Sequence, residues 1–171
     1  MKWILSREPI MTYPKIGNLA PTFSLLNQDG EKVELKQFRG KNVVVYFYPK
    51  ASTPGCTTQA CGLRDAHDDL ASVNTVVLGI SPDAPAKLKK FVDKYNLDFT
   101  LLSDVDHEVA DAYGIWGLKK FMGREYEGII RTSFIIDEGG KLRHIIEKVN
   151  TKTHDKDVVS YIKSNFYSDV L

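Results

Sequence analysis

The sequence predicts one α/β domain built on a mixed β-sheet, and three observations support this fold class. Two apolar runs, residues 43–48 and 75–80, contain no charged side chain, which is typical of strands buried on both faces. Amphipathic helical patterns alternate with such runs along the chain. Hairpin signals lie near both ends of the chain, which argues against an all-parallel sheet.

The first predicted elements form a β-hairpin. Residues 23–26 lead into the turn signal Asn-Gln-Asp-Gly at 27–30, and residues 32–35 then alternate as in a strand. A second turn at 38–41 precedes the apolar run 43–48. Pro49 ends that strand, because proline has no N–H to donate to a neighbouring strand.

A helix is predicted to begin directly after this strand. Thr53 suits the N-cap, and Pro54 suits the first helical position, where a missing N–H costs nothing. Cys56 then lies in the first turn, where free backbone N–H groups and the helix dipole favour negative charge. A thiol in that position ionises more readily, and the thiolate is its reactive form. The apolar face that continues this helix to about residue 72 comprises Ala60, Leu63, Ala66, His67 and Leu70.

The rest of the chain alternates between the two element types. In residues 84–95, apolar side chains recur at i, i+3, i+4 and i+7 with lysines opposite them, which predicts a helix. Residues 133–137 and 141–147, joined by Glu-Gly-Gly, predict a second hairpin. The complete set after residue 72 is strand 75–80, helix 84–95, strand 99–102, helix 106–113, hairpin 133–147 and helix 155–166.

Cys56 and Cys61 are the two cysteines of the chain, and their spacing limits how they can pair. In an intact helix, Cα atoms at i and i+5 lie roughly 8 to 9 Å apart, and the side chains leave about 140° apart around the axis. A disulfide needs Cα atoms within about 7 Å. If the segment is helical when reduced, it must unwind before the two sulfurs join, so the pair is interpreted as a redox-coupled unfolding switch.

Composition excludes several classes of protein. The chain has 171 residues, enough for one domain with a sizeable core, and a net charge of +1 argues against nucleic acid or an anionic membrane as partner. No apolar run approaches the length of a membrane span. Two cysteines in a chain of this length do not form a secreted disulfide framework, which favours a reducing, cytoplasmic location.

The N-terminus is interpreted as an extension of the domain. Its first apolar stretch ends after five residues, which is too short for a signal peptide. We expect residues 1–14 to form the extension and residues 15–171 to form the domain. Met11 is an alternative start of the functional chain.

The segment around Cys56, residues 43–65, is called the active stretch here, and it carries a specific family resemblance. A reactive cysteine at a strand-to-helix turn suggests a thioredoxin-like fold, although the spacing here is C-x4-C and not C-x2-C. Pro49, Thr53 and Cys56 match the P-x-x-x-T/S-x-x-C signature of peroxiredoxins. The stretch YFYPKASTPGCTTQACGLRD resembles the bacterioferritin comigratory protein, or peroxiredoxin Q, subfamily, as do YGIWG and RTSFIID further along. Gln59 stands where many relatives carry Glu, a difference expected to leave the core motif untouched.

The resemblance implies a thioredoxin-like peroxiredoxin fold, with a central mixed sheet flanked by helices and an N-terminal hairpin, and it implies a peroxidase. Cys56 would be the peroxidatic nucleophile that attacks a hydroperoxide and becomes a sulfenic acid. Arg131 would be a fixed cation that favours the thiolate and polarises the peroxide. Pro49, Thr53, Gly55 and Arg131 would form the peroxide-binding site, with Thr53 and nearby N–H groups positioning the substrate.

The resemblance also implies how the enzyme is recycled. Cys61 would resolve the sulfenic acid as an intramolecular Cys56–Cys61 disulfide, and thioredoxin or a similar dithiol would reduce that disulfide. The cycle closes within one chain, so a monomer is expected. No metal, haem or flavin is called for, and the substrates would be hydrogen peroxide and organic hydroperoxides.

Other interpretations of these residues stay open at this point. Cys61 could be a small buried hydrophobic residue, Thr53 only an N-cap, and Arg131 a surface ion-pair residue. His67 is interpreted as a core or boundary histidine, and the cysteine–histidine spacing is a poor zinc pattern. Trp116 and Phe121 are expected to pack, and the lysines at 119 and 120 to be solvated. The chief rival function is a general thiol–disulfide module or redox sensor without significant peroxidase turnover, and a structural metal-binding or scaffold domain is the third alternative.

Overall fold

The structure is a computed structural model that describes residues 12–167. Its centre is a seven-stranded mixed sheet in the order β2-β1-β5-β4-β3-β8-β9. The pairs β3–β4 and β4–β5 are parallel, and the other neighbours are antiparallel. The strands are β1 Ser24–Asn27, β2 Lys32–Glu34, β3 Asn42–Phe47, β4 Thr75–Ser81, β5 Thr100–Ser103, β8 Thr132–Ile136 and β9 Leu142–Ile146.

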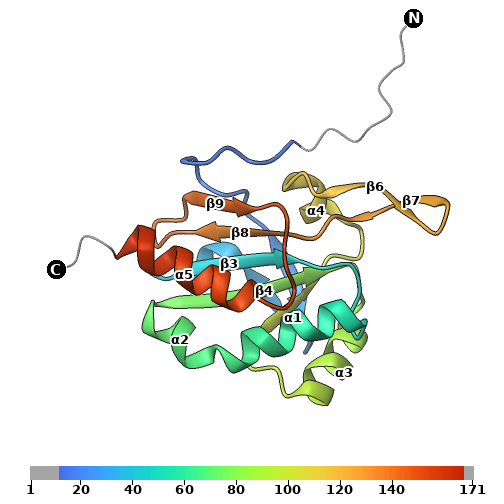
Figure 1. Ribbon diagram of the computed structural model, residues 1–171, viewed down its shortest axis with the longest axis horizontal. Helices are drawn as coiled ribbons and strands as arrows, with labels where there is room; N and C mark the ends of the chain where they lie inside the picture. Colours follow the sequence, from blue (N-terminus) through green and yellow to red (C-terminus); the bar gives the residue numbers. More distant parts are fainter. Residues whose placement is uncertain (1–11, 168–171) are drawn as a thin grey trace, which may run out of the picture.

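Helices cover both faces of this sheet, as Figure 1 shows. One face packs against α1, α2, α3 and α5, and the other packs against α4 and the N-terminal part of the described chain. The helices are α1 Pro54–Asp65, α2 His67–Ser72, α3 Pro85–Tyr95, α4 Glu108–Ala112 and α5 His154–Phe166, with a short 3-10 helix at Leu35–Phe38. Among the described residues, no helix combines the length and apolarity needed to cross a membrane.

Alternating side chains of the central strands divide the core into two clusters. All six residues of β3 are buried, because both sheet faces are covered. Val44 and Tyr46 face α1 and α5, whereas Val43, Val45 and Phe47 face α4. This two-sided burial explains why residues 43–47 of the strand form an unbroken apolar run.

The mixed sheet, both hairpins and the long helices confirm the predicted fold class, but one helix boundary was wrong. The expected helix from 54 to about 72 is interrupted at Ala66, which separates α1 from α2. Ala66 remains buried, and its N–H bonds the carbonyls of both Gly62 and Leu63. The chain therefore turns slightly at Ala66 while its apolar face stays on the sheet.

A second, two-stranded sheet was not predicted. Strands β6 Trp116–Phe121 and β7 Arg124–Ile129 pair antiparallel and extend from the body of the molecule in Figure 1. Most of β7 is exposed, so the hairpin lacks the apolar alternation that marks a strand in sequence. Phe121 was expected to pack but is 65% exposed near the turn of the hairpin. Trp116 does pack, with its ring stacked on His107 at 4.0 Å.

Candidate active site

Cys56 lies where the chain leaves the central strand and enters a helix. After β3, the loop 48–53 leads into α1, and Cys56 is the third residue of that helix. Thr53 occupies the N-cap position, and its carbonyl accepts the first helical bond from Thr57 N–H at 2.8 Å. Cys56 is 1% exposed and is a free thiol, so its sulfur sits in a confined space at the positive end of α1.

The Thr53 hydroxyl does not cap the helix as expected. It donates to the Lys50 carbonyl at 2.9 Å, and no side-chain cap bond is formed. A hydroxyl that donates in this way keeps its lone pairs available as acceptors. The Thr53 hydroxyl can therefore still accept a hydrogen bond while the Lys50 carbonyl fixes its orientation.

Asp83 holds the loop that precedes α1, a role that the sequence did not reveal. Its Oδ2 accepts hydrogen bonds from the Ala51 N–H at 2.7 Å and from the Ser81 hydroxyl at 2.8 Å. The loop also contains Ser52 with a φ of 68°, which is uncommon for a residue other than glycine. These hydrogen bonds of the buried carboxylate stabilise the irregular loop backbone and fix the loop relative to β4.

The pairing of β8 with β3 brings Arg131 to Cys56. Thr132 pairs with Phe47, so the residue before β8 lies beside the point where the chain leaves β3. Side chains at alternate positions share a face, and Ile135 of β8 packs in the same cluster as Cys56. Arg131 lies on that same face, and its Nη2 contacts the Cys56 sulfur at 3.3 Å. The guanidinium is half-buried, which limits the screening of its charge by water.

Gln59 belongs to this site, although sequence analysis did not name it as a site residue. It lies one turn after Cys56 on α1 and is 1% exposed. Its Oε1 accepts a hydrogen bond from Arg131 Nη1 at 2.6 Å. The two ends of the guanidinium thus contact a sulfur and an amide oxygen on the same helix. The acceptor for the guanidinium at this position is therefore a neutral amide.

His154 is a second residue that the sequence did not single out. It begins α5, is 1% exposed, and contacts Gln59 Nε2 through Nδ1 at 3.3 Å and Ser133 Oγ through Nε2 at 2.7 Å. Burial and the nearby Arg131 charge lower the pKa of His154 to about 4, although Asp157 acts in the opposite direction. His154 is therefore neutral at physiological pH. A lone histidine at a helix start gives no sequence signal for such a contact.

Cys61 lies on α1 one and a half turns beyond Cys56 and is partly exposed, not buried like a core residue. Both cysteines are free thiols within one continuous helix. Sequence analysis predicted that the segment must unwind if it is helical when reduced. The reduced segment is helical, so a bond between the two sulfurs requires that α1 unwinds locally.

The remaining predicted site residues lie around the same point of the fold. Pro49 is half-buried in the loop between β3 and α1. A Cβ atom added to Gly55 would lie 3.5 Å from Arg131 Nη2, so the backbone of Gly55 faces the guanidinium. The structure thus gathers Gly55, Cys56 and Arg131 in direct proximity, with Pro49 and Thr53 in the adjoining loop.

Lys119 is a further cation near the site and is not the solvated side chain that was expected. It is half-buried on β6, and its Nζ donates to the Ile129 carbonyl at 2.8 Å. Burial and repulsion from Arg131 lower the pKa of Lys119, while Cys56 acts in the opposite direction. Lys120, its neighbour, is exposed as expected.

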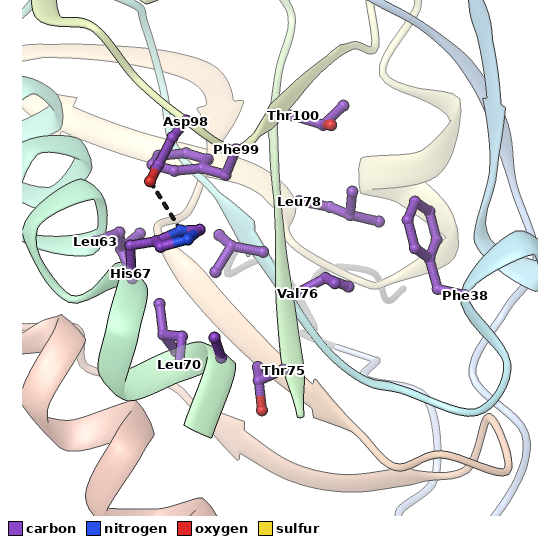
Figure 2. Close-up of a pocket in the computed structure, with 12 residues that line it drawn as sticks. Phe38, Leu63, His67, Leu70, Thr75, Val76, Leu78, Asp98, Phe99 and Thr100 are labelled. Atoms are coloured by element: carbon purple, nitrogen blue, oxygen red, sulfur yellow. Dashed lines mark ion pairs between the residues drawn. The ribbon is translucent and has the colours of Figure 1, made fainter. Parts of the chain in front are cut away.

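A cavity lined in part by the first residues of β4 is separate from the site around Cys56 and Arg131. Figure 2 shows Leu63, Leu70, Phe99, Val76 and Phe38 among the side chains that line it, and neither cysteine is among them. His67 was interpreted as a core or boundary residue, but it is exposed and pairs with Asp98 at 2.8 Å beside this cavity.

Comparison with known proteins places this arrangement in a family. The AhpC/TSA family matches residues 16–145. The putative peroxiredoxin bcp of Haemophilus influenzae is 56% identical over 149 residues, which are 87% of this chain and 96% of that protein. Peroxiredoxin Bcp of Escherichia coli strain K12 is 53% identical over 151 residues, which are 88% of this chain and 97% of that protein. Both alignments span nearly the whole relative.

Solved structures show the same fold. The bacterioferritin comigratory protein of Xanthomonas campestris, whose structures concern alkyl peroxide reduction, superposes with a TM-score of 0.81 and 27% identity, covering 88% of this chain and 98% of that one. Peroxidoxin BcpB of Mycobacterium tuberculosis gives a TM-score of 0.78 and 31% identity, covering 88% and 97%. The thioredoxin-like fold expected from the active stretch is thereby confirmed.

Proposed function

The chain belongs to the AhpC/TSA family and is a peroxiredoxin, and from this premise we propose that Cys56 is its peroxidatic residue and Cys61 its resolving residue. The protein is a thiol-dependent peroxidase. The observation that carries the assignment of roles is the contact of 3.3 Å between Arg131 Nη2 and the buried Cys56 sulfur at the start of α1.

In the first step, the Cys56 thiolate attacks the terminal oxygen of the hydroperoxide. The O–O bond breaks, an S–O bond forms, and the leaving alkoxide or hydroxide takes a proton to become an alcohol or water. Charge develops on both oxygens as that bond stretches, and the Arg131 guanidinium is placed to stabilise it. The Thr53 hydroxyl, oriented by Lys50, accepts a hydrogen bond from the peroxide.

In the second step, the Cys61 sulfur attacks the Cys56 sulfenic acid. An S–S bond forms, the S–O bond breaks, and the hydroxyl leaves as water with the thiol proton. Because both cysteines lie on α1, the helix unwinds locally before this step. A dithiol protein, which we take to be thioredoxin, then reduces the disulfide by exchange and is itself oxidised.

Four further assignments belong to this proposal. The enzyme acts as a monomer, because both cysteines belong to one chain. It works in the cytoplasm, an assignment supported by its having only two cysteines. The catalytic domain comprises residues 15–171, and residues 1–14 form an extension whose Tyr13 packs against Phe134 of the domain. Alkyl hydroperoxides are substrates as well as hydrogen peroxide, by similarity to the Xanthomonas campestris protein.

Single-turnover mixing of reduced protein with hydrogen peroxide tests the role of Cys56. We expect peroxide to be consumed far faster than by free cysteine, and the Cys56→Ser variant to lose this reaction. Cys61→Ser is the matched variant on the same helix, and it should keep the first turnover at the normal rate. Oxidation of both cysteines at the slow rate of free thiols would contradict the assignment.

Steady-state turnover with thioredoxin and its reductase tests the role of Cys61. Cys61→Ser should stop thioredoxin-dependent recycling, because the sulfenic acid then has no partner in the chain. Full turnover of that variant with thioredoxin would show that the enzyme uses only one cysteine.

A further inference from the structure

A continuous series of four contacts runs from the interior of the protein to the reactive sulfur. Ser133 Oγ contacts His154 Nε2 at 2.7 Å, and His154 Nδ1 contacts Gln59 Nε2 at 3.3 Å. Gln59 Oε1 then accepts from Arg131 Nη1 at 2.6 Å, and Arg131 Nη2 contacts Cys56 Sγ at 3.3 Å. The series joins β8, a strand of the sheet, to α5 and α1, which pack on that sheet.

The donors and acceptors of this series are fixed by chemistry. A guanidinium can only donate hydrogen bonds, so the Gln59 oxygen must face Arg131 and the Gln59 amide nitrogen must face His154. That nitrogen also only donates, so His154 Nδ1 must accept. The imidazole proton is therefore on Nε2, where it is donated to the Ser133 hydroxyl.

Burial makes this arrangement the only satisfactory one. Gln59 and His154 are each 1% exposed and Ser133 is fully buried, so water does not replace a lost partner. Protonated His154 would place an N–H against the Gln59 amide. The amide would then have to rotate and present its own N–H groups to Arg131, which has no acceptor.

We propose that His154 is a positioning residue for the peroxidase reaction, because it fixes the Gln59 amide that holds the Arg131 guanidinium against Cys56. The inference rests on the proposed roles of Cys56 and Arg131. The charged groups that act on the imidazole are Arg131, beside β8, and Asp157, on α5 itself. The neutral Tyr46 ring packs against it from β3, with centroids 5.7 Å apart.

Packing between α1 and α5 makes the contact possible. A Cβ atom added to Gly62 of α1 would lie 3.2 Å from Asp155 Oδ1 of α5, so the start of α5 approaches α1 closely at a glycine. His154 precedes Asp155 and is held in register with Gln59 by this approach. The His154 side chain is placed by the packing of the two helices and not by a flexible loop.

Two substitutions of His154 separate positioning from packing. His154→Leu fills the space with an apolar side chain but removes the acceptor. We expect the single-turnover rate constant with hydrogen peroxide to fall roughly tenfold, by analogy with the loss of an outer partner of a metal ligand. The pH–rate profile should also move to higher pH. His154→Asn offers a carbonyl oxygen near the position of Nδ1, so it should restore most of the rate.

A double-mutant cycle with Gln59→Leu tests the route of the effect. If His154 acts through Gln59, His154→Leu in the Gln59→Leu background should change the rate by less than about twofold, because the link is already absent. An equal loss of rate in both backgrounds, or a normal rate for His154→Leu alone, would overturn the inference. Thermal unfolding of each variant separates loss of fold from loss of rate.

The wild-type enzyme offers a measurement that does not depend on any variant folding. Nitrogen-15 NMR of histidine-labelled, reduced protein distinguishes the tautomers of a neutral imidazole. We expect His154 to be neutral with its proton on Nε2 at neutral pH, and the Nδ1–H tautomer or a protonated ring would overturn the inference. This result is independent of the Cys56→Ser experiment, whose failure would instead remove the proposed function.

Discussion

Arg131 Nη2 lies 3.3 Å from the Cys56 sulfur, although the two residues are separated by 75 positions in the chain. The antiparallel register of β3 and β8 creates this proximity, because Thr132 pairs with Phe47 beside the start of the active loop. The Gln59 oxygen occupies the other branch of the guanidinium. The cation is thus fixed at two points on one helix, which limits its rotation at the sulfur.

Replacement of Arg131 should slow peroxide reduction without unfolding the protein. Arg131→Ala removes the charge that we propose stabilises the thiolate and the breaking O–O bond, and we expect a loss of about 10² to 10³ in the single-turnover rate constant. The pH–rate profile should move to higher pH. Arg131→Lys should recover only part of the rate, because an ammonium cannot contact Gln59 and Cys56 as a planar fork does.

Arg143→Ala is the matched control for this prediction. Arg143 is an arginine of β9 that pairs with Asp137 at 3.3 Å near the surface. Its replacement should leave the peroxide rate and its pH dependence as in the wild type. Equal rates for Arg131→Ala and Arg143→Ala would exclude Arg131 from the reaction.

Formation of the Cys56–Cys61 disulfide should unwind part of α1. Gln59 lies between the two cysteines, so the same movement breaks its contacts with Arg131 and His154. Hydrogen exchange of the backbone amides of residues 57–62 should therefore become faster in the oxidised protein, while amides of α3 keep their protection. Oxidised Cys61→Ser, which cannot form the bond, should keep the slow exchange in α1. Unchanged exchange in the disulfide form would contradict the unwinding.

The residues that sequence analysis found are those that belong to local patterns. Cys56 and Thr53 lie in one contiguous signature, and the central strands show the apolar runs that burial on both faces demands. The hairpin β6–β7 was missed because it extends from the body, so most of β7 is exposed and shows no apolar alternation. Burial, which produces the sequence pattern of a strand, is absent there.

The residues that sequence analysis missed contribute through distant contacts. Asp83 follows β4 in the sequence, yet its carboxylate bonds the active loop at Ala51. His154 reaches Gln59 only because α5 packs on α1. Arg131 was found from the family resemblance and not from any spacing. Such contacts depend on sheet register and helix packing, which single-sequence patterns do not encode.

Asp83→Ala should loosen the loop that precedes α1. The substitution removes the acceptor of the Ala51 N–H and of the Ser81 hydroxyl in a buried setting, and we expect a loss of about 1 to 3 kcal/mol in the free energy of unfolding. Urea denaturation measures this loss, and faster hydrogen exchange at Ala51 locates it. Asp83→Asn keeps one carbonyl oxygen and should be affected less. Equal stability of Asp83→Ala and the wild type would contradict the anchoring role.

Removal of the Tyr46 hydroxyl should not destabilise the protein. Within the described part of the chain, this buried hydroxyl has no hydrogen-bond partner, so Tyr46→Phe removes a group that has lost its water without compensation. We expect the free energy of unfolding to be unchanged or to rise by about 1 kcal/mol. Tyr113→Phe is the matched comparison, because the Tyr113 hydroxyl donates to the Pro21 carbonyl at 2.7 Å. That variant should lose about 1 kcal/mol, and the reverse order of the two would contradict the prediction.

His154 should make the stability of the reduced protein depend on pH. Its pKa is lowered to about 4 in the folded protein, whereas a histidine in the unfolded chain titrates near pH 6.5. Between these values the unfolded chain binds a proton that the folded protein does not. The free energy of unfolding should therefore fall as the pH falls from about 6.5 to 4, by on the order of 3 kcal/mol in total, with no such loss above pH 6.5.

Urea denaturation at pH values from about 4 to 8 measures this dependence. His154→Asn, which cannot be protonated in this range, should flatten the curve through most of the window. His67→Asn is the control, because His67 is an exposed histidine paired with Asp98 and its loss leaves the buried imidazole in place. If His154→Asn has the same pH dependence as His67→Asn, then the buried imidazole is not the group that resists protonation, and the requirement for a neutral His154 at Gln59 has no support.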